Sequence, residues 1–222
     1  MFGNEFQFIL HIGLVLLSLY FAFRTGAEAL LVLTSVFFLL SNLFIIKQIT
    51  LFSLPTTAVD PFTVGSFFAA GLIQEYFGKD KADRLIRLFL MVALTFTTFA
   101  QIHLKYLPSS SDYSQFGFLT ILSTSPRIFI VSIISMTLSQ KLQIEALQRL
   151  RYRLPLMRAF FTALVIASVF DTVFFSLFAL TGVVSSLISI MLFSLLVKLV
   201  TIFTMTPFLT FFRKVEGNAP RF

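Results

Sequence analysis

Apolar residues in this chain fall into seven long runs that short polar stretches separate. The runs cover residues 6–23, 27–46, 61–77, 85–107, 116–140, 156–180 and 184–212. A helix needs about 20 apolar residues to cross a bilayer, and the strict alternation of a transmembrane strand is absent from these runs. The pattern therefore predicts an all-α polytopic membrane protein, built as a compact bundle of about seven transmembrane helices.

Length and composition agree with a single transmembrane domain. The chain has 222 residues, of which 57% are hydrophobic and only 12% are charged, a balance that a soluble domain of this size does not tolerate. We expect residues 1–26 to form an additional N-terminal helix, residues 27–212 a six-helix core bundle, and residues 213–222 a cytoplasmic tail.

Residues 61–77 form the weakest of the seven runs, because the run is short and contains Gly65 and Gly71. Two interpretations fit this pattern. The run could be a tilted or kinked helix, or it could be a discontinuous helix at a binding site, as transporters often use. In the second case Glu75, near its end, would be lifted toward a solute.

The distribution of basic residues predicts the orientation of the bundle in the membrane. With the N-terminus outside, the inner loops and flanks hold thirteen of the 17 Lys and Arg residues, whereas only Lys47 and Lys105 lie outside. The thirteen are Arg24, Lys79, Lys81, Arg84, Arg87, Lys141, Arg149, Arg151, Arg153, Arg158, Arg213, Lys214 and Arg221. Cytoplasmic loops of membrane proteins carry an excess of Lys and Arg, so we expect an outside N-terminus and an inside C-terminus.

Three charges remain inside the apolar runs: Arg127, Asp171 and Lys198. At about 1.5 Å of rise per residue, all three are expected near 20 Å from the inner boundary, and thus in one cluster. Asp171 continues a series of small residues at every fourth position, formed by Ala159, Ala163 and Ala167. Such a ridge permits close helix packing, so Asp171 is expected to face protein.

Each of these polar residues has a structural and a functional interpretation. Asp171 could form a salt bridge that holds the bundle, or it could bind solute or a coupling proton. Arg127 follows Pro126 and could bond carbonyls freed by a kink. Lys198 could neutralise Asp171 until a solute replaces it. Asn42 could bind a ligand or a neighbouring helix.

Several functional classes are excluded or disfavoured by what the sequence lacks. There is no cysteine, and only two histidines are present, so thiol chemistry is excluded and a metal site is not expected. No phosphate-binding G-x-x-x-x-G-K-[ST] motif and no nucleophile motif occurs. We therefore expect neither an enzyme nor a cofactor. The net charge of +7 is expected to serve topology and anionic lipids, not nucleic acid.

Five short motifs, in order along the chain, resemble those of the queuosine precursor transporters, also called the vitamin uptake transporter family. They are Ser41-Asn42 with Lys47; Glu75-Tyr76-Phe77-Gly78-Lys79 with Ala82 and Arg84; Pro126-Arg127-Ile128 with Ser139-Gln140; Arg158 with Asp171-Thr172 and Phe175; and Lys198 with Thr206-Pro207. The resemblance covers residues 41–212. The chain departs from the family pattern at Ala70-Gly71 and Gln143, where the family often has acidic residues, and at Ala163 and Ser168.

The resemblance implies an importer in the bacterial inner membrane that takes up queuine or a deazaguanine base such as preQ0 or preQ1 for tRNA modification. A carboxylate accepts the N–H donors of such a base, which assigns Asp171 and Glu75 to the substrate. Asn42 or Gln74 would meet its carbonyl side, and Arg127 and Lys198 complete the expected site. Phe side chains would stack on the ring.

Secondary-type transport is the expected mechanism. The alternative is a substrate-binding subunit of an energy-coupling-factor transporter, which needs separate ATPase subunits and would use the alanine ridge for docking. A homo-oligomer is also compatible with the sequence, whereas a membrane enzyme or a scaffold has no motif in its favour.

Overall fold

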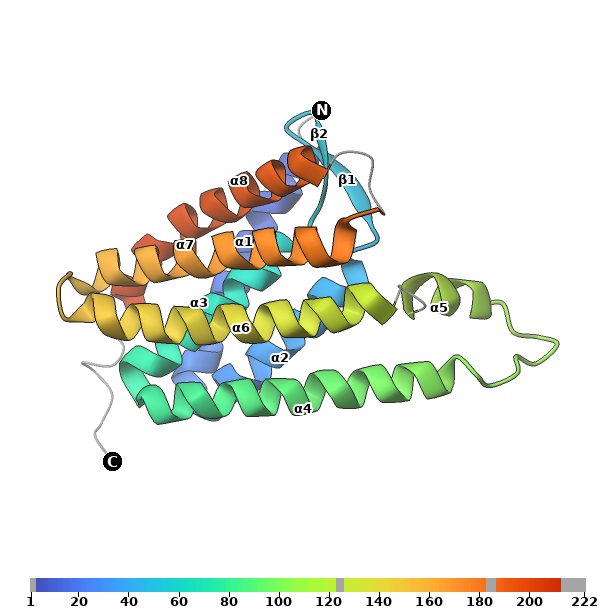
Figure 1. Ribbon diagram of the computed structural model, residues 1–222, viewed down its shortest axis with the longest axis horizontal. Helices are drawn as coiled ribbons and strands as arrows, with labels where there is room; N and C mark the ends of the chain where they lie inside the picture. The colour runs from blue at the N-terminus through green and yellow to red at the C-terminus, as the bar shows by residue number, and fades with distance from the viewer. Residues whose placement is uncertain (1–2, 123–125, 183–186, 213–222) are drawn as a thin grey trace.

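The computed structural model describes residues 3–122, 126–182 and 187–212, which form one helical bundle with a short hairpin at one end (Figure 1). Its helices are α1 (Gly3–Thr25), α2 (Ala27–Phe44), α3 (Asp60–Phe77), α4 (Lys79–His103), α5 (Gln115–Leu122), α6 (Pro126–Arg151), α7 (Leu156–Phe175) and α8 (Leu187–Met205). A π-helical segment, Ser176–Leu180, continues α7, and a 3-10 turn, Thr206–Phe208, follows α8. The expected tail, residues 213–222, lies outside the described residues.

Five of the described helices are long and apolar enough to cross a membrane: α1, α2, α4, α7 with its π-helical segment, and α8 with the residues to Phe212. The pair α5 and α6 would add a sixth span, although these two helices differ in direction by 49°. The expectation of an all-α polytopic membrane protein is thus confirmed. The expected single run over residues 116–140 is wrong, because two helices divide it and α6 continues to Arg151.

Helix α3 is less apolar than these spans, and its packing gives the reason. It contacts α1, α2, α4, α6, α7 and α8, and every residue from Val64 to Ile73 is buried. A helix that other helices surround meets little lipid, so small and polar residues such as Gly65, Ser66 and Gly71 are tolerated along it. The helix is unbroken from Asp60 to Phe77, which decides against the discontinuous helix.

A β-hairpin joins α2 to α3, where the sequence predicted the end of a helix and a turn. Its antiparallel strands are β1 (Gln48–Leu51) and β2 (Leu54–Thr57), with Gln48 opposite Thr57. Phe52 and Ser53 form the turn with positive φ angles of 49° and 66°, as a two-residue hairpin turn requires. Helix α2 therefore ends at Phe44, before the predicted residue 46.

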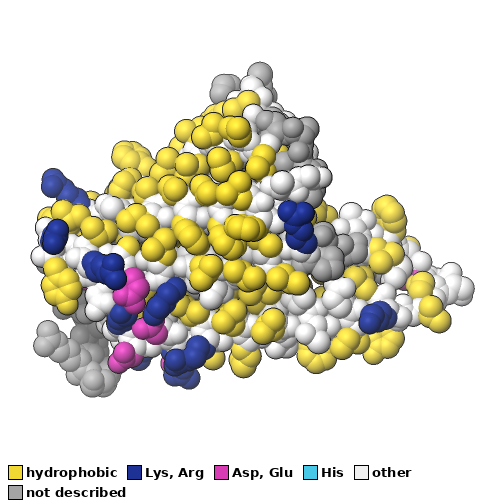
Figure 2. All heavy atoms as spheres, viewed as in Figure 1, with side chains coloured by type: hydrophobic (Ala, Val, Ile, Leu, Met, Phe, Trp, Pro, Cys, Tyr) yellow, Lys and Arg dark blue, Asp and Glu magenta, His cyan; other side chains and the backbone are white. Residues whose placement is uncertain are grey.

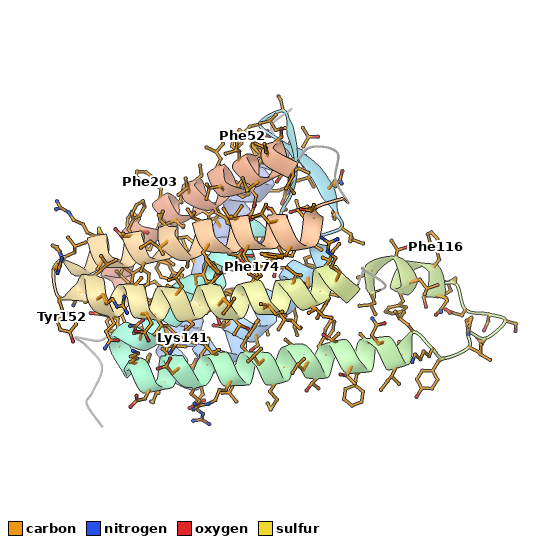
Figure 3. The ribbon with its side chains drawn as sticks, viewed as in Figure 1. Phe52, Phe116, Lys141, Tyr152, Phe174 and Phe203 are labelled. Carbon is orange, nitrogen blue, oxygen red and sulfur yellow. The ribbon has the colours of Figure 1, made fainter. Side chains whose placement is uncertain are left out.

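Two hydrogen bonds tie this hairpin to the first turn of α1. The Asn4 side-chain amide donates to the carbonyl of Thr50 over 2.8 Å, and Glu5 Oε1 accepts the backbone N–H of Phe52 over 3.0 Å. The N-terminus of α1 and the hairpin therefore share one end of the bundle, which we call the hairpin end. Phe52 marks this end in Figure 3.

Inter-helix ion pairs identify the opposite end, which we call the basic end. Lys79 pairs with Glu145 over 2.8 Å and Arg151 with Glu75 over 2.9 Å, so the α3–α4 and α6–α7 turns meet there. Blue and magenta side chains gather at this end in Figure 2, while apolar side chains cover most of the visible face. Figure 3 places Lys141 and Tyr152 there. This distribution is the one on which the predicted orientation depends.

Candidate functional site

The centre of the site is a buried ion pair between the last two long helices. Lys198 of α8 is 5% exposed and Asp171 of α7 is 8% exposed. The Lys198 ammonium donates to Asp171 Oδ2 over 2.8 Å and to the hydroxyl of Thr172 over 2.9 Å. Two predictions are confirmed: Asp171 faces protein, and two of the three intramembrane charges lie within salt-bridge reach.

Helix α6 supplies the second partner of Asp171. The Ser135 hydroxyl donates to Asp171 Oδ1 over 2.7 Å, and both residues are buried. The alanine ridge explains how the helices come so close: Ala159, Ala163 and Ala167 are all fully buried, and α7 packs closely against α6. Both oxygens of Asp171 are therefore occupied by protein donors.

Asp60 completes the charged group, and the sequence analysis missed it. It is 3% exposed at the first turn of α3, where Asp60 Oδ1 accepts a hydrogen bond from Ser194 over 3.0 Å and lies 3.8 Å from the Lys198 ammonium. Asp60 Oδ2 is buried and has no hydrogen-bond partner among the described residues. In the sequence, Asp60 belongs to the polar stretch before the apolar run 61–77. An acidic residue directly before an apolar run is the signal that could have identified it.

A cavity of about 560 Å³ lies beside these three charges. Its lining comes from the end of α2, the hairpin, the start of α3, the first half of α6, the end of α7 with its π-helical segment, and the first two thirds of α8. Polar lining residues include Asn42, Gln48, Asp60, Asp171, Ser194 and Lys198; aromatic ones are Phe38, Phe175 and Phe193. Its volume is typical of small-molecule sites, which usually combine an apolar wall with a few polar groups.

Asn42 is the other predicted site residue that lines this cavity. It lies late in α2, and its side-chain amide donates to the carbonyl of Phe38 over 3.0 Å within the same helix. That bond fixes the orientation of the amide and occupies one of its donors. Asn42 therefore bonds its own helix, whereas one of the two interpretations expected a bond to a neighbouring helix.

Arg127 lies away from the cavity, at the first turn of α6. Its guanidinium Nε donates to the carbonyl of Phe178 in the π-helical segment over 2.7 Å. The depth estimate for Arg127 is wrong because α6 ends at Arg151 and not at residue 140, which moves Arg127 toward the hairpin end. It does bond a carbonyl, as the kink interpretation predicted, but one from another element.

Glu75 and Gln74 lie at the basic end of α3 and do not line the cavity. Both oxygens of Glu75 are paired with the Arg151 guanidinium, over 2.9 and 3.0 Å. The Gln74 amide donates to the carbonyl of Ile144 over 2.8 Å. Because α3 is unbroken, nothing lifts these residues toward the cavity.

The charges of the site define what it accepts. With both carboxylates ionised and Lys198 protonated, the wall carries one net negative charge, and the free oxygen of Asp60 is an unused acceptor. Such a wall favours a ligand that brings N–H donors or a cationic amine, and it disfavours an anion. In the described part of the chain, no group of three His, Asp or Glu side chains is placed to hold a metal ion.

Comparisons with known proteins bear on the family of the chain. The chain is 28% identical to the "Probable queuosine precursor transporter" of Bacillus subtilis (strain 168) over 187 residues, which cover 82% of each chain. No solved structure matches the chain. The model of the family described as "Putative vitamin uptake transporter" matches residues 61–212, a segment that includes Asp171 and Lys198 and begins directly after Asp60. The chain therefore belongs to the vitamin uptake transporter family.

Proposed function

We propose that this membrane transporter imports a queuosine precursor, either queuine or a deazaguanine base such as preQ0 or preQ1, across the bacterial inner membrane. The observation that carries the proposal is the cavity beside Asp60, Asp171 and Lys198. Next to it, the buried oxygen Oδ2 of Asp60 has no hydrogen-bond partner among the described residues. The name of the Bacillus subtilis relative supports the same class of substrate.

The chemistry of a deazaguanine fits this cavity. The pyrimidine edge of the base presents N–H donors, for which Asp60 Oδ2 is the available acceptor. Phe38 and Phe175 line the cavity and offer apolar faces to a flat ring. Asn42 lies in the same wall for the carbonyl side of the base. A precursor with a cationic amine would in addition match the net negative charge.

Asp171 and Lys198 have a different role in this proposal. They already satisfy each other, so they hold α7 and α8 together and set the potential of the cavity. A proton or a cationic solute that reaches Asp60 changes the balance of the three charges and weakens the hold of Lys198 on one carboxylate. This coupling favours secondary-type transport over a fixed binding site.

The alternative, a substrate-binding subunit with separate ATPases, loses the feature that favoured it. Ala159, Ala163 and Ala167 were candidates for a docking surface, but the three side chains are fully buried within the chain. They pack α7 inside the bundle and cannot meet another subunit in this conformation. Secondary transport by the chain itself is therefore the function that we propose.

Uptake measurements test the proposal directly. Cells that lack their own precursor transporter would express the chain and receive labelled queuine, preQ0 and preQ1, with adenine as the control solute. We expect saturable uptake of at least one precursor. In cells that express the Asp60→Asn variant at equal membrane abundance, the solute concentration for half-maximal uptake should be about tenfold higher or more. Uptake of none of the three, by protein that is inserted and stable, would reject the proposed substrate class. Uptake only when ATPase subunits are supplied would replace it by the alternative.

A further inference from the structure

A row of polar side chains continues from the cavity toward the basic end. Ser132 lines the cavity, and Ser135, Ser139 and Gln143 follow it on α6 at intervals of three or four residues, so all four share one helical face. Ser135 and Ser139 are 0% exposed and Gln143 is 1% exposed. The row therefore runs through the interior of the bundle and does not face lipid.

Contacts with α3 and α7 place this row between three helices. At the end of the row nearer the cavity, the Ser135 hydroxyl donates to Asp171 of α7. Because α6 and α7 run antiparallel, this contact places Ser168 of α7 at about the same level as Ser139. Further along, the Gln143 amide donates to the carbonyl of Phe67 in α3 over 2.7 Å. A Cβ atom on Gly71 of α3 would lie 3.1 Å from the same amide.

Several atoms in this region have no hydrogen-bond partner among the described residues, although all are buried. They are Ser139 Oγ, Gln140 Oε1, Gln140 Nε2, Gln143 Oε1 and Ser168 Oγ. Hydroxyls elsewhere in these helices bond the carbonyl four residues earlier, as Thr137 does with Ile133. An unsatisfied buried polar group destabilises the structure, so these five atoms favour a state in which a hydrogen-bonding solute or water reaches them.

Beyond the row, weak ion pairs close the basic end of the bundle. The ion pairs Glu75–Arg151, Lys79–Glu145 and Asp83–Lys141 connect the α3–α4 turn to α6. Their side chains are between 19% and 51% exposed, and exposed pairs of this kind contribute little to stability. Inside them, the rings of Phe68 and Phe160 pack edge to face at 4.9 Å between centroids.

We propose that Ser139, Gln140, Gln143 and Ser168 form a second solute site, closed in this structure, through which the solute leaves the cavity toward the basic end. The site offers uncharged donors and acceptors, so it suits the amide and amine edge of a neutral planar ring. It carries no net charge, unlike the cavity beside Asp60, Asp171 and Lys198. It therefore binds a cationic or N–H-rich solute less tightly, which favours release. Parting of the three ion pairs opens it. The inference rests on the proposed function, because it assigns the inner half of the same path.

Thiol labelling tests this site without background, because the chain has no cysteine. Single variants Ser139→Cys and Ser168→Cys would be reacted with a membrane-impermeant maleimide applied to the basic-end side of vesicles. The matched control is Ser66→Cys, since Ser66 is equally buried on α3 but its hydroxyl is satisfied by the carbonyl of Thr34. We expect queuine to accelerate labelling of both test variants about tenfold or more relative to the control. A tenfold change corresponds to a shift of about 1.4 kcal/mol in the free energy of opening.

A Glu75→Gln substitution, added to each cysteine variant, separates failure of this inference from failure of the proposed function. It weakens one ion pair, so labelling of residues 139 and 168 should rise even without solute. If no precursor accelerates labelling but Glu75→Gln does, the path stands and the proposed substrate is wrong. If residues 139 and 168 label no faster than residue 66 under either condition, in protein that transports precursor, the second site is refuted.

Uptake by a variant without the polar row provides the second measurement. The double variant Gln140→Leu, Gln143→Leu should lower the maximal uptake rate about tenfold or more, because roughly one or two hydrogen bonds along the path are lost. The dissociation constant at the cavity beside Asp60 should stay the same. An unchanged uptake rate would show that these side chains only pack the bundle, and it would overturn the proposal.

Discussion

Replacing Asp60 by Asn tests the central feature of the site, the carboxylate oxygen Oδ2, which has no hydrogen-bond partner among the described residues. The substitution keeps the shape of the side chain and can keep the bond to Ser194, which engages only Oδ1 at 3.0 Å. It removes the charge and turns one acceptor into a donor, so the hydrogen bond from a solute N–H to Oδ2 is lost. Binding should weaken, whereas folding should change little because Lys198 keeps its closer partner, Asp171, at 2.8 Å.

The expected magnitude follows from that single contact. A hydrogen bond to a charged group contributes about 1.5–3 kcal/mol, so the dissociation constant for queuine or preQ1 should rise about 10- to 150-fold. The ion pair that is weakened spans 3.8 Å and is the longer of the two that Lys198 makes. We therefore expect the melting temperature of Asp60→Asn to stay closer to that of the parent than the melting temperature of any variant of Lys198.

Purified protein in lipid nanodiscs allows both quantities to be measured on the same sample. Titration with labelled solute gives the dissociation constant, and thermal unfolding gives the stability. Asp83→Asn is the matched control, because Asp83 is also paired with a lysine but lies at the basic end. If Asp60→Asn binds as tightly as the parent protein, the reasoning from the free oxygen is wrong. If both aspartate variants weaken binding equally, the effect is one of net charge and not of the site.

Three further predictions concern other parts of the bundle. Asp171→Asn should abolish uptake while the protein still inserts, and in thermal unfolding it should destabilise less than Lys198→Met, which leaves two buried carboxylates without a cation and costs about 3–5 kcal/mol. Gly71→Ala should cost about 1–3 kcal/mol by overpacking, because its Cβ would lie 2.6 Å from the Phe160 ring; Gly13→Ala, which meets nothing within 4 Å, is the control in the same unfolding assay. Reporter fusions should place residues 152–155 in the cytoplasm, and an outside location would refute the predicted orientation.

Hydropathy by itself determined the class of this protein and most of its helices. Long apolar runs can form only helices in a bilayer, since every backbone polar group must be satisfied within the segment, so the pattern predicted the all-α membrane fold correctly. Small residues at every fourth position likewise predicted that Asp171 faces protein, because such a ridge is useful only against another helix. The cost of leaving a charge alone in the membrane predicted that at least two of the three intramembrane charges pair, and it left a pair of Asp171 with Lys198 as one possibility.

Tertiary structure decided which other residues join that pair. Asp60 reaches Lys198 across 138 positions of the chain only because α3 starts inside the bundle and α8 passes beside it, and no local pattern encodes that meeting. Arg127 was expected at the site from its apparent depth, and Glu75 if the helix that carries it were broken. The true length of α6 and the unbroken course of α3 place both residues elsewhere. Sequence fixes how far residues lie along one helix, whereas the distance between helices depends on how all of them pack.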